Sequence, residues 1–243
     1  MTAEDWTPNP GFKVPPPTGY PPEEGRYVRG NDLSPAAVCV ILKWREDEIP
    51  EGIEKLVRVG VESGAALSGT LQTENIGIEK MICNIVANPN IRYLVVCGPE
   101  SPGHLVGQTL KALAANGLGE DSRIIGAESL TPYLYNIPRE AVERFRRQIR
   151  IVDLVDEGDP GLVRDAVWSC YQEQPTQFRG QVLFDPGAMP GEPICASITW
   201  RVRNPWYAPR NEDEKAALER MHELMERIRA RNEARRRGEQ QEQ

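Results

Sequence analysis

A short, almost uninterrupted apolar run at residues 91–97 constrains the fold of this chain more than any other feature. Runs of this kind are typical of strands in a parallel sheet that helices cover on both faces. A turn rich in glycine and proline follows, and from Leu105 apolar residues recur at helical spacing up to Asn116-Gly117, a left-handed helix cap. The sequence therefore predicts a strand, a turn and a helix, with the turn at the sheet edge where open α/β folds bind ligands.

The same alternation of strand and helix continues on both sides of this run. The apolar stretch at residues 36–42 predicts a strand, and residues 49–63 have helical spacing. Further along we expect strands at residues 65–70, 123–127 and 149–155, helices at residues 75–88, 137–148 and 159–172, and a hairpin-like pair of strands at residues 181–185 and 194–201. Strands that alternate with helices in this way pair in parallel through right-handed crossovers. The predicted fold is Rossmann-like α/β, a mostly parallel sheet with helices on both faces, a small C-terminal β extension and a C-terminal helix.

Composition divides the chain into four parts. Residues 1–32 are dominated by proline, glycine and charge, so we expect an extended arm without a core of its own. Residues 33–160 are expected to form the α/β domain, and residues 161–210 an α+β extension packed on it. Residues 211–243 place apolar side chains in a ragged heptad among charges, which predicts a charged helix or tail that is exposed or binds a partner.

Charge and residue usage exclude several classes of protein. The chain of 243 residues can bury a sizeable core, and its net charge of -7 argues against a general nucleic-acid binder. It has no apolar run long enough for a membrane span and no signal-peptide pattern, so we expect a cytoplasmic protein. The five cysteines are scattered singly, and the three in apolar runs are expected to be buried. A solvated face is expected for four arginines, Arg144, Arg146, Arg147 and Arg150. The sequence does not determine the oligomeric state.

His104, one of only two histidines, lies in the turn after residues 91–97. Its position alone fits a helix cap or a hydrogen bond to a loop carbonyl as well as a functional role. The neighbouring Gly98, Gly103 and Gly107 favour function, because they remove side chains and let a bulky group approach. These glycines match neither the dinucleotide fingerprint nor the phosphate loop with its Lys-Ser/Thr ending, which argues against nucleotide binding.

Several uncommon strings occur together in an order and spacing that resemble a known family. They are Gly64-Ala65-Ala66-Leu67-Ser68-Gly69, Thr73-Glu74-Asn75-Ile76-Gly77-Ile78-Glu79-Lys80, Asn88-Pro89-Asn90-Ile91-Arg92, Cys97-Gly98 with Gly103-His104 and Gly107-Gln108, Asn116-Gly117 with residues 123–127, and residues 136–145. Over residues 32–156 the sequence resembles the corrinoid-carrying A subunit of tetrahydromethanopterin S-methyltransferase. The resemblance implies an α/β domain that carries cobalamin, with His104 as the lower axial ligand of its cobalt. The general cobalamin signature D-x-H-x-x-G is absent, because Pro102 stands two residues before His104.

The resemblance also implies methyl carriage. Cobalt would take a methyl group from a nitrogen of a reduced pterin and pass it to a thiol or another acceptor, while the protein holds and tunes the cofactor. The implied partner is a pterin-binding methyltransferase subunit, separate from this chain. An axial histidine needs an acceptor for its other ring nitrogen, and Glu100, Ser101 or a backbone carbonyl could serve. Family members commonly end in a membrane anchor, whereas this sequence ends in the charged helical pattern, so we expect a form without a membrane span.

Three loops are expected to meet around the corrinoid, because each follows a predicted parallel strand. The expected contact residues are Gly69, Thr70, Thr73, Glu74 and Asn75 in the first loop, Gly98, Pro99, Ser101, Gly103, His104, Gly107 and Gln108 in the second, and Gly126, Ala127, Pro132 and Tyr133 in the third. Helix capping is the alternative for Thr73, Glu74 and Asn75, and ordinary packing is the alternative for Tyr133. Two other functions stay open: a cobalamin-binding module for storage or sensing and, less favoured, a nucleotide-binding α/β enzyme.

Overall fold

The computed structural model describes residues 9–43 and 49–198, and single residues between positions 212 and 227. The chain divides into two compact units, Met1–Thr199 and Trp200–Gln243. In the second unit the described residues, among them Glu212, Lys215 and Glu219, are helical, as the charged pattern predicts. The sheet, the helices named below and the predicted site all belong to the first unit.

A five-stranded sheet forms the centre of the first unit, in the order β1-β3-β2-β4-β5. Its strands are β1 (Tyr27–Arg29), β2 (Ala36–Ile41), β3 (Leu67–Leu71), β4 (Tyr93–Gly98) and β5 (Arg150–Val155). The strands β2 to β5 are parallel, and β1 pairs antiparallel with β3. The central strands β2 and β4 are buried along their whole length, as their continuous apolar sequences require.

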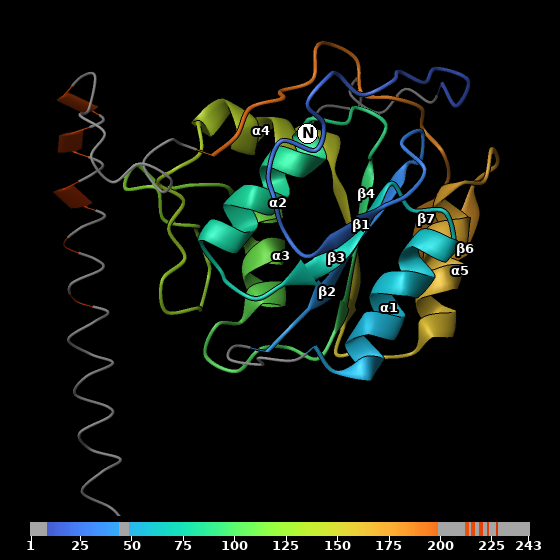
Figure 1. The fold of residues 1–243 in the computed structure, drawn as a ribbon, viewed down its shortest axis with the longest axis horizontal. Coiled ribbons are helices and arrows are strands. Elements are labelled where there is room, and N and C mark those ends of the chain that lie inside the picture. The colour runs from blue at the N-terminus through green and yellow to red at the C-terminus, as the bar shows by residue number, and fades with distance from the viewer. Residues whose placement is uncertain are drawn as a thin grey trace, which may run out of the picture. The chain divides into compact units, whose positions relative to one another are not determined.

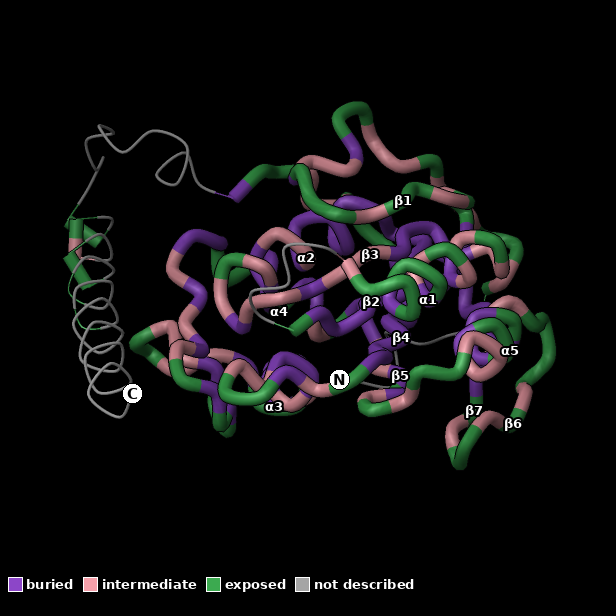
Figure 2. The backbone as a smooth tube through the Cα atoms, turned by 60° about the horizontal axis from the view of Figure 1, so that its bottom comes forward, coloured by how far each residue is buried: buried purple, intermediate pink, exposed green. Residues whose placement is uncertain are grey.

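Helices cover both faces of this sheet (Figure 1). The helices α1 (Glu51–Glu62) and α5 (Pro160–Cys170) pack on one face, and α2 (Ile76–Val86), α3 (Val106–Asn116) and α4 (Arg139–Gln148) pack on the other. A separate hairpin pairs β6 (Thr176–Phe178) with β7 (Gln181–Leu183). Figure 2 shows β2 and β4 as buried and the outer turns of α1 as exposed. This arrangement confirms the predicted Rossmann-like α/β fold, and among the described residues no helix is long and apolar enough to cross a membrane.

Two of the predicted strands are wrong. Residues 123–127 form no strand of the sheet, because Ile124 makes an isolated bridge to Leu118 and Arg123 makes one to Tyr133. The segment thus pairs with its own neighbours, and β5 takes the place beside β4. Residues 181–183 pair with β6, and the described residues 194–198 contain no strand, while residues 199–201 lie outside the described part.

The burial of polar side chains differs from the sequence-based expectation at one arginine. Arg144 is buried rather than solvated, because its Nε donates to Gln148 Oε1 at 2.9 Å and one terminal nitrogen donates to the Pro190 carbonyl at 3.1 Å. A buried guanidinium needs such acceptors, which the charge pattern of the sequence does not reveal. The expected burial of cysteines is confirmed, since Cys39, Cys83, Cys97 and Cys170 are buried.

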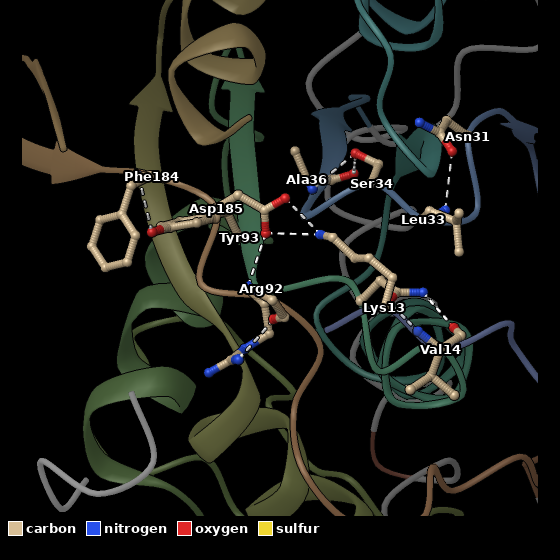
Figure 3. Close-up of polar contacts among 12 residues, drawn as sticks. Lys13, Val14, Asn31, Leu33, Ser34, Ala36, Arg92, Tyr93, Phe184 and Asp185 are labelled. Carbon is tan, nitrogen blue, oxygen red and sulfur yellow. Dashed lines mark hydrogen bonds and ion pairs between the residues drawn. The ribbon is translucent and has the colours of Figure 1, made fainter. Parts of the chain in front are cut away.

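Residues 9–32 belong to the first unit and join its sheet through β1. Lys13 Nζ lies 2.6 Å from an oxygen of Asp185, and Val14 N donates to the side-chain oxygen of Asn90 at 3.1 Å (Figure 3). Close by, Phe184 N donates to the Tyr93 hydroxyl at 3.4 Å. These contacts lie at the amino end of β4, so they hold the edge of the sheet opposite to the predicted site.

Removal of the chain after Pro209 tests the independence of the first unit. Because the cut lies outside Met1–Thr199, we expect the shortened protein to keep the thermal midpoint of the full chain within about 3 °C, which corresponds to less than about 1 kcal/mol. Circular dichroism melting curves of both proteins provide the measurement. A much larger fall would show that residues beyond 209 stabilise the α/β unit.

A buried carboxylate, Glu79, joins α2 to Asn136, which lies three residues before the start of α4. Its oxygens accept hydrogen bonds from Asn136 N at 2.6 Å and Asn136 Nδ2 at 3.0 Å. Burial raises the pKa of Glu79 to about 7, although the bonds from Asn136 act in the opposite direction, and the charge of Glu23 raises it further. Ionised Glu79 is therefore disfavoured in the folded chain relative to the unfolded one.

The free energy of unfolding should fall between about pH 5 and pH 8, because unfolded Glu79 ionises near its ordinary pKa and folded Glu79 only near pH 7. Glu79→Gln should flatten this dependence by up to about 3 kcal/mol, measured by urea unfolding at both pH values. Glu54→Gln, at a solvent-exposed position in the first turn of α1, is the matched control. A Glu79→Gln protein with the slope of the parent would contradict the assignment.

Candidate functional site

The connection between β4 and α3 is built around the carboxylate of Glu100. β4 ends at Gly98, whose φ of +88° needs glycine, and α3 begins at Val106, two residues later than His104. The Glu100 oxygens accept hydrogen bonds from Ser101 N at 2.9 Å, Gly107 N at 3.1 Å and Gln108 N at 2.9 Å. A side-chain carboxylate thus occupies the N-terminus of α3, where its charge also suits the helix dipole.

His104 extends from this loop to a carboxylate on the neighbouring loop. Its Nδ1 lies 2.6 Å from Glu74 Oε2, and Glu74 follows β3 in the segment that leads to α2. The Glu74 side chain is 1% exposed, whereas that of His104 is 24% exposed. The partner expected for the histidine was Glu100, Ser101 or a backbone carbonyl; Glu100 instead bonds the backbone of its own loop, and Glu74 contacts the imidazole.

Glu74 also holds a third segment, between α3 and α4. Its Oε1 accepts from Thr131 Oγ1 at 2.7 Å and from Thr131 N at 3.1 Å. Asn75 adds a bond from its Nδ2 to Thr131 Oγ1 at 3.2 Å. Burial would raise the pKa of Glu74, but the hydrogen bonds from His104, its own backbone and Thr131 lower it below the ordinary value. Glu74 is therefore ionised, and it accepts hydrogen bonds from the loop that carries His104 and from the segment that carries Thr131.

An ionised carboxylate selects one tautomer of the neutral imidazole. Because Glu74 can only accept, Nδ1 carries the proton, and the lone pair of the His104 ring lies on Nε2. Imidazole held in this way by a carboxylate is a typical metal ligand. Among the described residues no group of three His, Cys, Asp or Glu side chains is placed to hold a metal ion.

The surroundings of this pair combine open space with exposed apolar side chains. A Cβ atom at Gly103 would meet no atom within 4 Å, so the residue beside His104 faces open space. Ile76 and Leu130 are large apolar residues that stay exposed, and they adjoin Asn75 and Thr131, which bond within this network. The hydroxyl of Ser101 is buried without a hydrogen-bond partner. A large group with apolar and polar edges fits such a surface.

The side-chain amide of Gln108 links α3 to the third segment. Its Nε2 donates to the Gly126 carbonyl at 2.9 Å, and its Oε1 accepts from Glu128 N at 3.1 Å. The sequence offered no reason to select Gln108 beyond its position one turn after His104. In the structure it fixes the segment that also carries Thr131.

The remaining predicted site residues lie in several environments. Gly69 and Thr70 are in β3 and line a cavity under α2, and Thr73 Oγ1 accepts from Gly77 N at 2.9 Å, which is a capping contact. Asn75 caps α2 through Ile76 N. In the third segment Ala127 and Pro132 are buried, and Tyr133 stacks on Tyr135 with ring centroids 5.4 Å apart. Pro99 is exposed, as is Gly126.

One residue of the network, Thr131, was not expected from the sequence. It lies 57 residues from Glu74 along the chain, and nothing in the local pattern of residues connects the two. The sequence placed residues 123–127 in the sheet and expected the loop after them, with Pro132 and Tyr133, to reach the site, but it did not single out Thr131. The polar residues directly before Pro132, in a stretch too short for a strand, would have been a better signal because they indicate a loop.

Comparison with known proteins decides the family. The model of the family described as the A subunit of tetrahydromethanopterin S-methyltransferase matches residues 13–199. The chain belongs to this family. It is similar to the tetrahydromethanopterin S-methyltransferase A subunit 2 of Methanothermobacter marburgensis, with 45% identity over 75% of this chain and 87% of the relative. It is also similar to the A subunit 2 of Methanothermobacter thermautotrophicus, with 44% identity over 76% of this chain and 90% of the relative, and to the A subunit of Methanocaldococcus jannaschii, with 41% identity over 75% and 68%.

Membership in this family extends beyond the residues on which the resemblance was first recognised. The match includes residues 13–31 and 157–199, which lie outside the stretch that carries the resemblance. These are the segments that meet at the amino-end edge of the sheet through Lys13 and Asp185. The family match therefore covers nearly the whole first unit and ends where the second unit begins.

Glu74→Gln tests the tautomer assignment. The variant replaces one acceptor oxygen by an NH₂ donor, so the side chain can no longer accept from both His104 and Thr131. We expect the ring proton of His104 to redistribute toward Nε2, which the ring ¹⁵N chemical shifts measure. Glu128→Gln, at an exposed position of the third segment, should leave the shifts unchanged. Equal tautomer populations in parent and Glu74→Gln proteins would argue against a directing role for Glu74.

Proposed function

We propose that this chain is a corrinoid carrier that binds cobalamin, with His104 as the lower axial ligand of cobalt. The observation that carries the proposal is the imidazole of His104 at the carboxyl edge of the parallel strands, held through Nδ1 by the buried carboxylate of Glu74. Family membership supports it, because the family was identified in the sequence by strings that include Gly103-His104 and Thr73-Glu74. A macrocycle that supplies the other ligands of its metal needs only one from the protein.

Each residue of the network has a role in this proposal. Glu74 keeps the ring proton on Nδ1 and raises the basicity of Nε2, and the two bonds from Thr131 fix the orientation of Glu74. Gly103 leaves room beside the ring, and Ile76 and Leu130 offer apolar contact to a large planar group. When bound, cobalamin supplies a cobalt centre able to accept and release a methyl group. The chain itself binds, orients and tunes this centre.

The proposed transfer runs from a reduced pterin to a thiol or another acceptor. The names of the relatives describe a methyltransferase that acts on tetrahydromethanopterin and transfers to sulfur, and they describe these chains as one subunit of it. We therefore infer that a pterin-binding methyltransferase subunit is the partner of this chain. Storage or sensing of cobalamin without methyl transfer is the second candidate, because it requires the same binding residues.

Nucleotide binding is less compatible with the site. A phosphate would bind the backbone amides at the N-terminus of α3, but Ser101, Gly107 and Gln108 donate theirs to the carboxylate of Glu100. A second anion at this position would be repelled by Glu100. The backbone amides that would bind a phosphate are thus already bonded to the side chain of Glu100.

Reconstitution with hydroxocobalamin tests the proposal directly. After gel filtration the protein should carry the corrinoid in equimolar amount, and reduction to cobalt(II) should give a paramagnetic resonance signal with nitrogen coupling. Labelling the protein histidines with ¹⁵N distinguishes the ring from nitrogens of the cofactor, since ¹⁵N gives a doublet and ¹⁴N a triplet. We expect the doublet in the parent protein.

His104→Ala should retain much of the cobalamin but lose the ¹⁵N doublet, because the macrocycle supplies most contacts while the axial bond depends on the imidazole. His222→Ala, which replaces the other histidine of the chain, is the matched control and should keep the doublet. If the histidine only stabilised its loop, His104→Ala would cost about 1 kcal/mol of stability and leave the cobalt spectrum unchanged. A colourless protein peak would overturn the proposed function as a whole.

A further inference from the structure

A groove of about 730 Å³ lies beside β5, the last strand of the sheet. Its walls come from the C-terminal parts of α3 and α4 and from β7. In Figure 2 the strands follow one another in the order β1, β3, β2, β4 and β5, with α3 and β7 on either side of β5. The groove therefore exposes one edge of the sheet between a helical wall and the hairpin.

The backbone of β5 has one edge that faces this groove. On the other edge Arg150 N donates to the carbonyl of Arg92, beside β4, at 2.9 Å. Since the backbone groups of successive residues in a strand point to opposite sides, the N–H and C=O groups of Ile151 and Asp153 point away from β4. Val155 N, on the same side, donates to the Asp153 carboxylate at 3.1 Å. The described part of the chain places no strand on this side, so the edge can accept one.

Short and apolar side chains line the space beside this edge. Ala114 and Ala115 lie at the C-terminal end of α3, and Val182 on β7 is 41% exposed. An extended chain between these walls would direct alternate side chains to α3 and to β7. A helix satisfies its backbone groups internally and would leave the edge of β5 unused. The shape of the groove therefore favours a strand.

Basic side chains outnumber acidic ones in the groove. Lys111 Nζ lies 2.8 Å from an oxygen of Asp153, and Arg146 pairs with Glu143 at 3.0 Å. Each acidic side chain of the lining thus has a basic partner within the lining. The full set of charged lining residues is Lys111, Glu143, Arg146, Arg147, Arg150 and Asp153, so the charge of the groove is positive.

Buried arginines beside the groove add to this charge. Burial and the charge of Arg147 lower the pKa of Arg144. Burial lowers the pKa of Arg92 to about 10, and the charges of Arg144 and Arg150 act in the same direction. These guanidinium groups repel one another, and an anionic side chain in the groove would reduce the repulsion. Because the whole chain has a net charge of -7, the positive region is a local feature.

We propose that this groove binds an extended acidic segment of a partner protein, which adds a strand to the free edge of β5. The backbone groups of Ile151 and Asp153 supply hydrogen bonds, the walls contact apolar side chains, and carboxylates of the segment lie near Arg147. A second copy of this chain would bring an equally positive groove to the interface. A nucleic acid would leave the backbone groups of the strand edge without partners.

A labelled peptide of about six residues, with alternating valine and glutamate, tests the proposal. It should bind the full chain with a Kd below about 100 μM in fluorescence anisotropy titrations. The same peptide with lysine in place of glutamate should bind at least about tenfold more weakly. Methylation of all its backbone amide nitrogens keeps the side chains but removes the donors that a strand needs, and it should also weaken binding at least about tenfold.

Arg147→Glu reverses a charge at an exposed position of α4, outside the strand itself. It should weaken binding of the acidic peptide at least about fivefold. Arg58→Glu makes the same change of charge at an exposed position of α1, on the other face of the sheet, and should alter binding less than about twofold. Circular dichroism melting curves of both variants verify that the fold is kept.

No binding of the acidic peptide, or equal binding of the acidic and basic peptides, would overturn the proposal. A dimer of the full chain in sedimentation velocity that Arg147→Glu dissociates would assign the groove to a second copy instead. Tighter binding of a short single-stranded DNA than of the acidic peptide, lost in the same variant, would assign it to nucleic acid. Each of these results is independent of corrinoid binding.

Discussion

The hydrogen bonds of one buried carboxylate, Glu74, hold the site of this protein together. Two oxygens accept from His104 on one side and from Thr131 on the other, so three segments that are distant in sequence meet at one charge. A buried anion is tolerated only while such donors compensate for the loss of water. Because displacement of either segment would leave the charge poorly compensated, the position of the imidazole is coupled to the position of the segment between α3 and α4.

Because of Glu100, the loop between β4 and α3 differs from a loop that binds phosphate. By accepting from three backbone amides it satisfies the N-terminus of α3 with a group that belongs to the chain. The edge of the fold that binds anions in other α/β proteins is thereby occupied by a carboxylate of the chain itself. Glu100 shapes the backbone of the loop, and Glu74 directs the ring that the loop carries.

The sequence predicted those parts of the fold that depend on local pattern. β4 and α3 follow from a continuous apolar run and a change to helical spacing, because a central parallel strand must be apolar on both faces. Residues 123–127 gave a similar but shorter signal, and there Ile124 is buried while Ile125 is exposed, since the segment folds over the edge of the sheet. The meeting of the three loops was expected as well, but which side chains bond each other across them was beyond such reasoning. His104 and Glu74 are 30 residues apart, and only the adjacency of the loops after β3 and β4 brings them together.

The contact between Lys13 and Asp185 has a consequence for synthesis of the protein. The two residues are separated by 172 positions, so the amino-end edge of the sheet cannot be completed until most of the chain has left the ribosome. Strands β2, β3 and β4 can pair earlier, because each is followed by a helix that returns the chain to the next strand. Long-range contacts of this kind slow folding. The nascent chain therefore carries its N-terminal residues without their final partner while the central strands assemble.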